Sequence, residues 1–255
     1  MSLPKMQEKS PWSYSRLSSY EHCPMSYKLS YVDKVPQVNN AYAEYGSYCH
    51  AILEEFARGN LMSFELASKY KDGYDKQIIS YFPPYPKGLS GRYFEQGLQY
   101  FDTFDGFGDN YEILAIEERA NVEIGGESVT GIIDLLLEDK NTGELVIVDH
   151  KTKAIKEMTK GLQYAVRQLY MYSCFVAEKY KRYPSLLRYN MLRYGEIIEI
   201  PFQTDAYLDT LAWITNTIAQ INNDKTWEAK PSKYFCQHIC GSRYECSEAQ
   251  SRFII

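Results

Sequence analysis

Apolar side chains recur along the chain with two different periods, which divide it into helical and strand-rich stretches. A spacing of three to four positions predicts helices, and short runs rich in Val, Ile and Leu between turn residues predict strands. We expect helices at 13–33 (two short helices meeting at Cys23 and Pro24), 45–58, 64–81, 92–104, 159–179 and 205–222. We expect strands at 111–122, on both sides of a turn at 138–143, and in a hairpin at 188–194 and 196–202.

The chain has 255 residues and is 45% hydrophobic, which is enough for one domain with a sizeable core. No apolar run approaches the roughly 20 residues that span a bilayer. The N-terminus lacks the apolar core of a signal peptide, so a cytoplasmic location without membrane contact is expected. Residues 1–12 are expected to be flexible. The net charge of −5 opposes nucleic-acid binding, but basic residues gather after position 150.

The hairpin expected between residues 130 and 151 carries charged side chains among apolar ones. Asp134 lies in its first strand, and Asp149 and Lys151 end its second. Because side chains alternate between the two faces of a strand, Asp149 and Lys151 point the same way and His150 points the other way. Burying two carboxylates and an ammonium is costly unless they pair or hold a metal ion. The hairpin is therefore a candidate site, with a plain surface hairpin as the alternative.

The spacing Gly131-x-x-Asp134, followed by Asp149-x-Lys151, resembles the core of the PD-(D/E)XK nuclease superfamily, in particular its RecB-like branch. The resemblance implies that Asp134, Asp149 and the backbone carbonyl of His150 bind Mg²⁺ or Mn²⁺. It also implies that Lys151 orients or activates the water that attacks the phosphodiester.

A helical segment near the N-terminus adds to the resemblance. Gly46, His50 and Glu54 recur at intervals of four, so they share one face of the helix expected at 45–58. On general grounds a single helical histidine is more often a packed core residue than a ligand. The spacing is, however, similar to that of the helix which supplies the active-site histidine of the RecB-like branch. The resemblance implies that His50 is a catalytic residue and a metal ligand.

The strand expected at 111–122 resembles the first core strand of the family, where a glutamate adds to the metal site. Glu117 is the predicted residue, and Glu118 is the alternative, because a slip of one position exchanges the two faces of a strand.

The long helix expected at 159–179 carries the last part of the resemblance to the catalytic region. Gln168 and Tyr172 lie four positions apart and share a face. The pair resembles Gln-x-x-x-Tyr of the RecB-like branch, which implies contact with the DNA backbone beside the metal. Arg167 and Lys153 are the basic neighbours predicted to bind DNA phosphates.

Three cysteines, Cys236, Cys240 and Cys246, fall within eleven residues near the C-terminus, and Cys23 is the candidate for a fourth ligand. Without a secretory signal, metal or cluster ligation is a better interpretation than disulfides. The layout resembles the four-cysteine [4Fe–4S] site of AddB-type and CRISPR-associated RecB-like nucleases, in which the cluster joins both ends of the domain. Zinc on the same thiolates, or with His238 in place of one, is the alternative.

The motifs follow the family's order from Ser15 to Cys246, and the resemblance implies the family's fold. This is an α/β, restriction-endonuclease-like fold with a mixed central sheet, flanking helices and an active site at the sheet edge. A single domain is expected over 13–255. Within it, 13–33 and 226–250 would form the cysteine region, and 61–108 would be a helical insertion.

The implied function is a Mg²⁺- or Mn²⁺-dependent DNA exonuclease. Such an enzyme would act in recombination, repair, phage replication or CRISPR-related DNA processing, with a helicase or recombination protein as a conceivable partner. Two alternatives belong to other classes. One is a non-catalytic DNA-binding scaffold that keeps the fold and the cluster, and the other is a zinc-stabilised module that binds protein.

Overall fold

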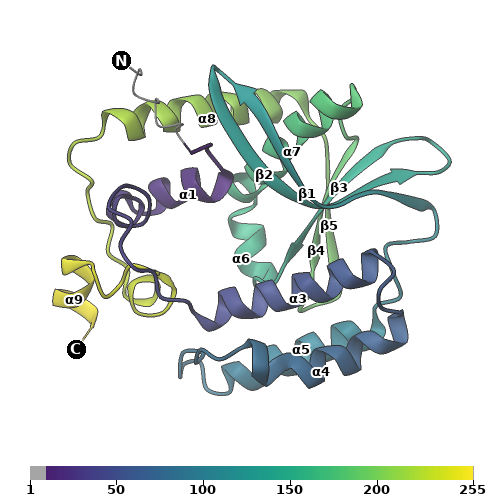
Figure 1. Cartoon of the computed structure of the whole chain (residues 1–255), viewed down its shortest axis with the longest axis horizontal. Helices are drawn as coiled ribbons and strands as arrows, with labels where there is room; N and C mark the ends of the chain where they lie inside the picture. Colours follow the sequence, from purple (N-terminus) through teal and green to yellow (C-terminus); the bar gives the residue numbers. More distant parts are fainter. Residues whose placement is uncertain (1–9, 255) are drawn as a thin grey trace, which may run out of the picture.

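The computed structural model describes residues 10–254, which form a five-stranded sheet with helices on both faces (Figure 1). The strands follow the chain in the order β1-β2-β3-β4-β5. All neighbours are antiparallel except β3 and β4, which are parallel. The α/β class with a mixed central sheet is therefore confirmed. The strands are β1 (Tyr111–Ile124), β2 (Glu127–Asp139), β3 (Leu145–Lys151), β4 (Leu186–Met191) and β5 (Glu196–Pro201).

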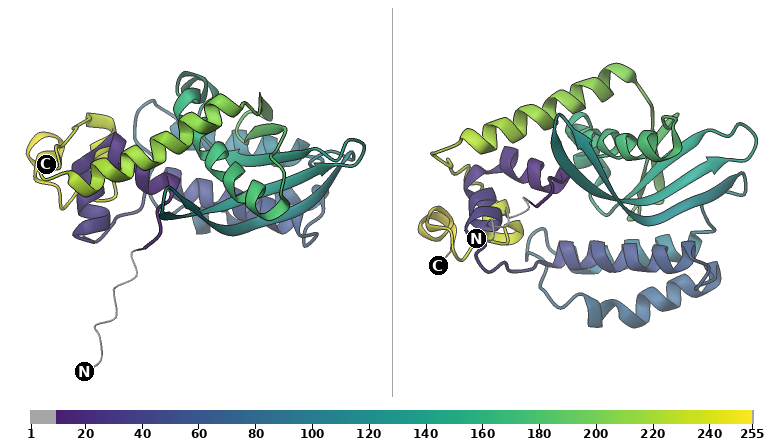
Figure 2. Two further views of the ribbon diagram at one scale, coloured as in Figure 1. Left: turned by 90° about the horizontal axis from the view of Figure 1, so that it is seen from above. Right: turned by 45° about the horizontal axis from the view of Figure 1, so that its top comes forward.

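Helices cover the sheet in separate layers. On one face lie α7 and α8, and across the other face runs α3, which separates the sheet from α4 and α5 (Figures 1 and 2). The α-helices are α1 (Tyr14–His22), α2 (Pro24–Tyr27), α3 (Ala41–Ala57), α4 (Leu66–Gln77), α5 (Leu89–Thr103), α6 (Ile155–Lys160), α7 (Leu162–Tyr180), α8 (Thr204–Asn223) and α9 (Ser247–Phe253). Three short turns of other helix types are η1 (Lys28–Val32), η2 (Ser63–Glu65) and η3 (Phe235–Ile239).

The central strand β3 is buried on both faces, as its apolar sequence requires. Leu145 and Ile147 contribute to the core beneath α7 and α8. Val146 and Val148 contribute to a smaller cluster on the opposite face. Asp149 and Lys151 continue the first series, so their side chains emerge toward α7.

Tyrosines fill the layer formed by α3, α4 and α5. The rings of Tyr45, Tyr70 and Tyr93 meet at edge-to-face angles, and the first two hydroxyls donate to the backbone oxygen of Tyr93 at 3.2 and 3.3 Å. Buried phenols need such partners for their hydroxyls. The helical segments expected in 61–108 therefore pack mainly on α3, and α5 also reaches the sheet beside it, where the Tyr100 hydroxyl accepts from Asn190 of β4 at 2.7 Å.

Several element boundaries differ from the expected ones for local reasons. Helix α3 begins at Ala41, because Asn40 caps it by accepting the Ala43 amide at 3.0 Å. Helix α4 ends at Gln77, and the Glu44 carboxylate then accepts both the amide and the hydroxyl of Ser80. The single helix expected at 159–179 is two helices, α6 and α7, which meet at Gly161.

The N-terminal segment joins the sheet earlier than expected. Residues 1–9 of the predicted flexible stretch lie outside the described residues. Trp12, however, is buried and pairs with β2, where its amide donates to Ser128 and its carbonyl accepts from Thr130. Apolar burial thus fixes the chain at Trp12. Within residues 10–254, no helix is long and apolar enough to cross a bilayer.

Candidate active site

The site lies where β2 and β3 separate. Their antiparallel pairing ends at Leu135 and Val148. Beyond this point, which we call the fork, a side chain joins the two strands. Oδ2 of Asp134 accepts a hydrogen bond from the His150 amide at 2.7 Å. The side chains of Asp134 and Asp149, 10% and 1% exposed, are thus both held close to the fork between the strands.

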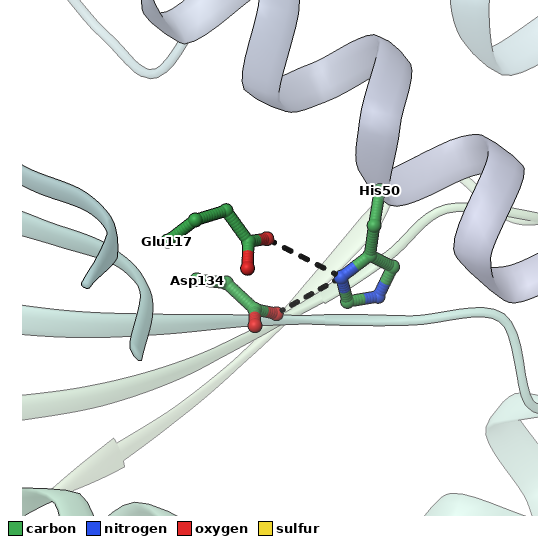
Figure 3. A group of neighbouring side chains, drawn as sticks. All are labelled: His50, Glu117 and Asp134. Carbon is green, nitrogen blue, oxygen red and sulfur yellow. Dashed lines mark ion pairs between the residues drawn. The ribbon is translucent and has the colours of Figure 1, made fainter. Parts of the chain in front are cut away.

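His50 approaches this fork from α3. Its Nε2 lies 2.9 Å from the backbone oxygen of His150, and its Nδ1 lies 3.5 Å from Asp134 and 3.8 Å from Glu117 (Figure 3). A carbonyl oxygen can only accept, so Nε2 carries a proton and Nδ1 faces the two carboxylates. The ligand atoms of His50, Glu117 and Asp134 all lie within 4.8 Å of one another.

Glu117 reaches the group through an unusual backbone conformation. Its φ angle of 47° is in the left-handed region, which a non-glycine residue in a strand rarely adopts. The adjacent residue Glu118 instead pairs with Lys179 of α7. Of the two glutamates weighed from the sequence, the structure therefore brings Glu117 to His50.

Asp149 and Lys151 begin a chain of polar contacts on the α7 side. Lys151 Nζ lies 2.5 Å from Asp149 Oδ2 and donates to Gln168 Oε1 at 2.9 Å. Gln168 Nε2 donates in turn to the Tyr172 hydroxyl at 2.7 Å. Gly131 makes room for this arrangement, because a Cβ there would come within 2.7 Å of the Tyr172 ring. The ammonium of Lys151 is thereby held from two sides.

Burial and mutual repulsion disturb the charges at the fork. Burial first, and then the Asp149 carboxylate, raise the pKa of Asp134 from 3.8 to about 7. Burial opposes the charged form of His50, but the surrounding carboxylates, Glu117 first, outweigh it and raise the pKa of His50. The fork thus favours extra positive charge, as protons or as a cation.

A divalent cation fits this donor set. Asp149 Oδ2 is buried and has no partner in hydrogen-bonding geometry among the described residues, despite its contact with Lys151. The His50 Nδ1 that faces Asp134 and Glu117 offers a nitrogen ligand. Carboxylate oxygens are the ligands that Mg²⁺ and Mn²⁺ prefer. The imidazole nitrogen of His50 favours Mn²⁺ over Mg²⁺.

The metal-free protein is expected to lose stability between about pH 4 and pH 7 because of Asp134. Its folded pKa of about 7 lies above the ordinary 3.8, so the folded state binds the proton more tightly. The stabilisation is complete below the lower value and is lost as the pH rises through the upper one. Thermal unfolding in EDTA across this range measures the effect, and Asp134→Asn should remove it.

The difference in unfolding temperature between the wild type and Asp134→Asn at each pH reports the contribution of this carboxyl alone. Addition of Mn²⁺ should restore wild-type stability near pH 7 and leave Asp134→Asn nearly unchanged, because a bound cation favours the ionised carboxylate. Parallel pH curves for the two proteins in EDTA would contradict the assignment.

The residues predicted to bind DNA lie in different surroundings. Lys153 is exposed beyond the end of β3. Arg167 lies 3.2 Å from Glu21 and stacks over Trp213, so its charge is partly compensated. Tyr172 is 5% exposed, and with Gln168 it borders a cavity of about 330 Å³. Inside the protein, Gln168 bonds Lys151 and Tyr172 bonds Gln168, as described above. DNA binding by all four residues stays a prediction.

The candidate cluster ligands Cys23 and Cys240 lie where the C-terminal segment packs on the N-terminal helices. The Cys23 thiol accepts the Lys230 amide at 3.4 Å, and the Cys240 thiol lies 3.5 Å from the Ser26 hydroxyl. Burial raises the pKa of Cys240, and the nearby thiols of Cys236 and Cys246 raise it further. All six cysteines of the chain are free thiols.

Comparison with known proteins decides the family. The profile of the PD-(D/E)XK nuclease superfamily matches residues 11–247. The chain belongs to this superfamily. The matched region extends from the N-terminal helices through the fork to the cysteine region, so it includes nearly all described residues.

Two solved structures are similar to this chain at low sequence identity. One is a "putative exonuclease" from Eubacterium rectale, with 12% identity, a TM-score of 0.49, and coverage of 100% of this chain and 95% of that one. Another is SSO0001, with 17% identity, a TM-score of 0.37, and coverage of 92% and 95%. No curated protein gives a match.

Sequence reasoning missed one residue that borders the candidate site. Tyr189 of β4 lies in register with Asp149 across the parallel pair β3 and β4. Its sequence context is an ordinary apolar strand, and 39 residues separate it from Asp149. Only the pairing of the two strands could have indicated it. The expected location at the sheet edge is also only partly right, because Asp149 and Lys151 lie on the central strand.

Proposed function

We propose that this member of the PD-(D/E)XK superfamily is a metal-dependent DNA exonuclease. The observation that carries the proposal is the meeting of His50, Glu117 and Asp134 within 4.8 Å at the fork, next to the Asp149 and Lys151 pair. A non-catalytic scaffold would have no use for buried carboxylates whose repulsion opposes folding.

The side chains at the fork divide into two groups with different tasks. His50, Asp134, Asp149 and the carbonyl of His150 would hold Mg²⁺ or Mn²⁺, with Glu117 as a further ligand. When bound, the cation supplies Lewis-acid polarisation of a phosphoryl oxygen and of the attacking water. Lys151 orients that water and offsets the negative charge that develops on the phosphate. Gln168, supported by Tyr172, would hold the Lys151 ammonium beside the fork, from which it turns to the substrate.

The cysteine region is proposed to hold a [4Fe–4S] cluster on Cys23, Cys236, Cys240 and Cys246. The place of these thiols supports the proposal, because Cys240 lies near Cys236 and Cys246, and Cys23 contacts the C-terminal segment at Lys230. Zinc on the same thiolates, or with His238 in place of one, is the alternative.

A comparison of linear and circular DNA tests the proposed activity. With Mn²⁺, the protein is expected to release short products from end-labelled linear DNA, single- or double-stranded. Covalently closed circles of the same sequence should stay intact, and EDTA should stop the reaction. Cleavage of circles would indicate an endonuclease. A folded protein that binds DNA but cuts neither form would favour the scaffold, and a helicase or recombination partner could then be sought.

Glu117→Gln is expected to lower kcat about 10- to 100-fold, because the change removes one negative charge from the proposed metal site. The matched control is Glu118→Gln on the adjacent residue, which breaks only a surface ion pair with Lys179. Such pairs contribute about 0–1 kcal/mol, so this variant should retain its activity. Steady-state cleavage rates across a Mn²⁺ series measure both. Loss in Glu118→Gln with activity in Glu117→Gln would reverse the assignment.

A further inference from the structure

One buried tyrosine beside the site has a hydroxyl without a partner. Tyr189 of β4 lies in parallel register with Asp149 of β3, and residues paired in this way point to the same face of the sheet. The Tyr189 side chain is fully buried, and its hydroxyl makes no hydrogen bond to any residue of the described chain. Buried hydroxyls nearly always have a partner, so this one requires an explanation.

Asp149 carries the complementary atom. Its Oδ2 is buried, contacts Lys151 at 2.5 Å and lacks a partner in hydrogen-bonding geometry within residues 10–254. The Lys151 ammonium lies 5.8 Å from the centre of the Tyr189 ring. Donor, acceptor and ammonium therefore lie together on the face that α7 covers. Burial first, and then Asp149, raise the pKa of Tyr189 well above its ordinary value, so the hydroxyl keeps its proton.

Two other tyrosines near Asp149 already take part in a hydrogen bond, Tyr14 as a donor and Tyr172 as an acceptor. The Tyr14 hydroxyl donates to the backbone oxygen of Tyr164 at 3.1 Å. The Tyr172 hydroxyl accepts from Gln168 at 2.7 Å. Of these three tyrosine hydroxyls, that of Tyr189 alone makes no hydrogen bond with a described residue.

We propose that Tyr189 is a positioning residue whose hydroxyl donates to Asp149 and holds this carboxylate toward the cation when Lys151 turns to the substrate. The inference rests on the proposed function, in which Asp149 binds the cation and Lys151 orients the water. When Lys151 leaves Asp149, the carboxylate loses its cationic neighbour on the α7 side. A donor on the adjacent strand compensates this loss without movement of the backbone, as a rigid element supports a site best.

Tyr189→Phe tests this role because the change removes a single oxygen atom. The matched control is Tyr74→Phe, since the Tyr74 hydroxyl is also buried and unpartnered among the described residues but belongs to α4. For Tyr189→Phe, the Mn²⁺ dissociation constant, measured by electron paramagnetic resonance with a non-cleavable DNA bound, should rise about ten-fold, as expected for a lost hydrogen bond to a charged group. kcat should fall by a similar factor, with KM for DNA unchanged.

Protein stability separates positioning from packing. Both variants should unfold at the wild-type temperature or slightly above, because neither hydroxyl is paired in the fold. Tyr74→Phe should keep wild-type Mn²⁺ affinity and kcat. Wild-type values in Tyr189→Phe, or equal losses in both variants, would overturn the inference while the proposed function stands. A wild-type protein that binds no Mn²⁺ and cuts no DNA would overturn the proposed function and this inference with it.

Discussion

Asp149→Asn is expected to lower kcat by at least about 1,000-fold while the protein stays folded. The carboxylate is 1% exposed, lies 2.5 Å from the Lys151 ammonium and faces the fork with Asp134. Asparagine keeps the volume but cannot supply the charge that a divalent cation needs. Lys151 keeps its hydrogen bond to Gln168, so the ammonium is not left without a partner. Cleavage of end-labelled DNA, Mn²⁺ binding and thermal unfolding measure the effect.

The control for this loss is Glu55→Gln on α3. Glu55 is paired with Lys69 at 2.8 Å, so the change also breaks an ion pair, but it does so on the surface and away from the group around His50. The variant should cleave DNA at the wild-type rate. An active Asp149→Asn protein would contradict the metal role of Asp149, and an inactive Glu55→Gln protein would show that ion-pair loss alone inactivates the enzyme.

Among the variants proposed here, Cys240→Ala is expected to lower the unfolding temperature most. It should also remove the visible absorption of the protein. If four thiolates hold a [4Fe–4S] cluster, loss of one ligand releases the link between the N-terminal helices and the C-terminal segment. Ligand binding contributes folding free energy of many kcal/mol in small metal sites, so the unfolding temperature should drop by about 10 °C or more. Absorption spectra and thermal unfolding of anaerobically purified protein measure both effects.

Cys174→Ala is the matched control, because Cys174 is also a buried free thiol but lies in the core beneath α7. This variant should lose only the packing of one sulfur atom, which lowers the free energy of unfolding by about 1 kcal/mol, and it should keep the visible absorption. A colourless wild-type protein that contains zinc would indicate that the four thiolates bind zinc instead of a cluster. A colourless, metal-free wild type in which Cys240→Ala behaves like Cys174→Ala would contradict any ligation.

The hairpin that carries the candidate site could be predicted because strand geometry is local. A period of two places Asp149 and Lys151 on one face, and the structure holds them there as an ion pair. The choice between Glu117 and Glu118 needed more than periodicity. The left-handed backbone of Glu117 and its place opposite Asp134 determine which carboxylate meets His50.

Contacts between distant segments could not be predicted from the chain. Gly161 divides the expected helix at 159–179, yet a glycine within a helical pattern is often tolerated. The hydrogen bond from Lys151 to Gln168 depends on how α7 crosses the sheet. The pairing of Asp149 with Tyr189 depends on the parallel neighbours β3 and β4, whose connection contains α6 and α7. Tertiary packing determines which distant residues meet, and the periodicity of apolar residues carries no information about that packing.

The most direct test of the metal site is anomalous diffraction from crystals soaked in Mn²⁺. One strong anomalous peak is expected at the fork, bound by His50, Asp134, Asp149 and the backbone carbonyl of His150, with Glu117 as a further ligand. A second soak with Asp149→Asn crystals should give a weaker peak or none. A peak that lies elsewhere, or a fork without manganese in crystals of an active wild type, would contradict the central claim.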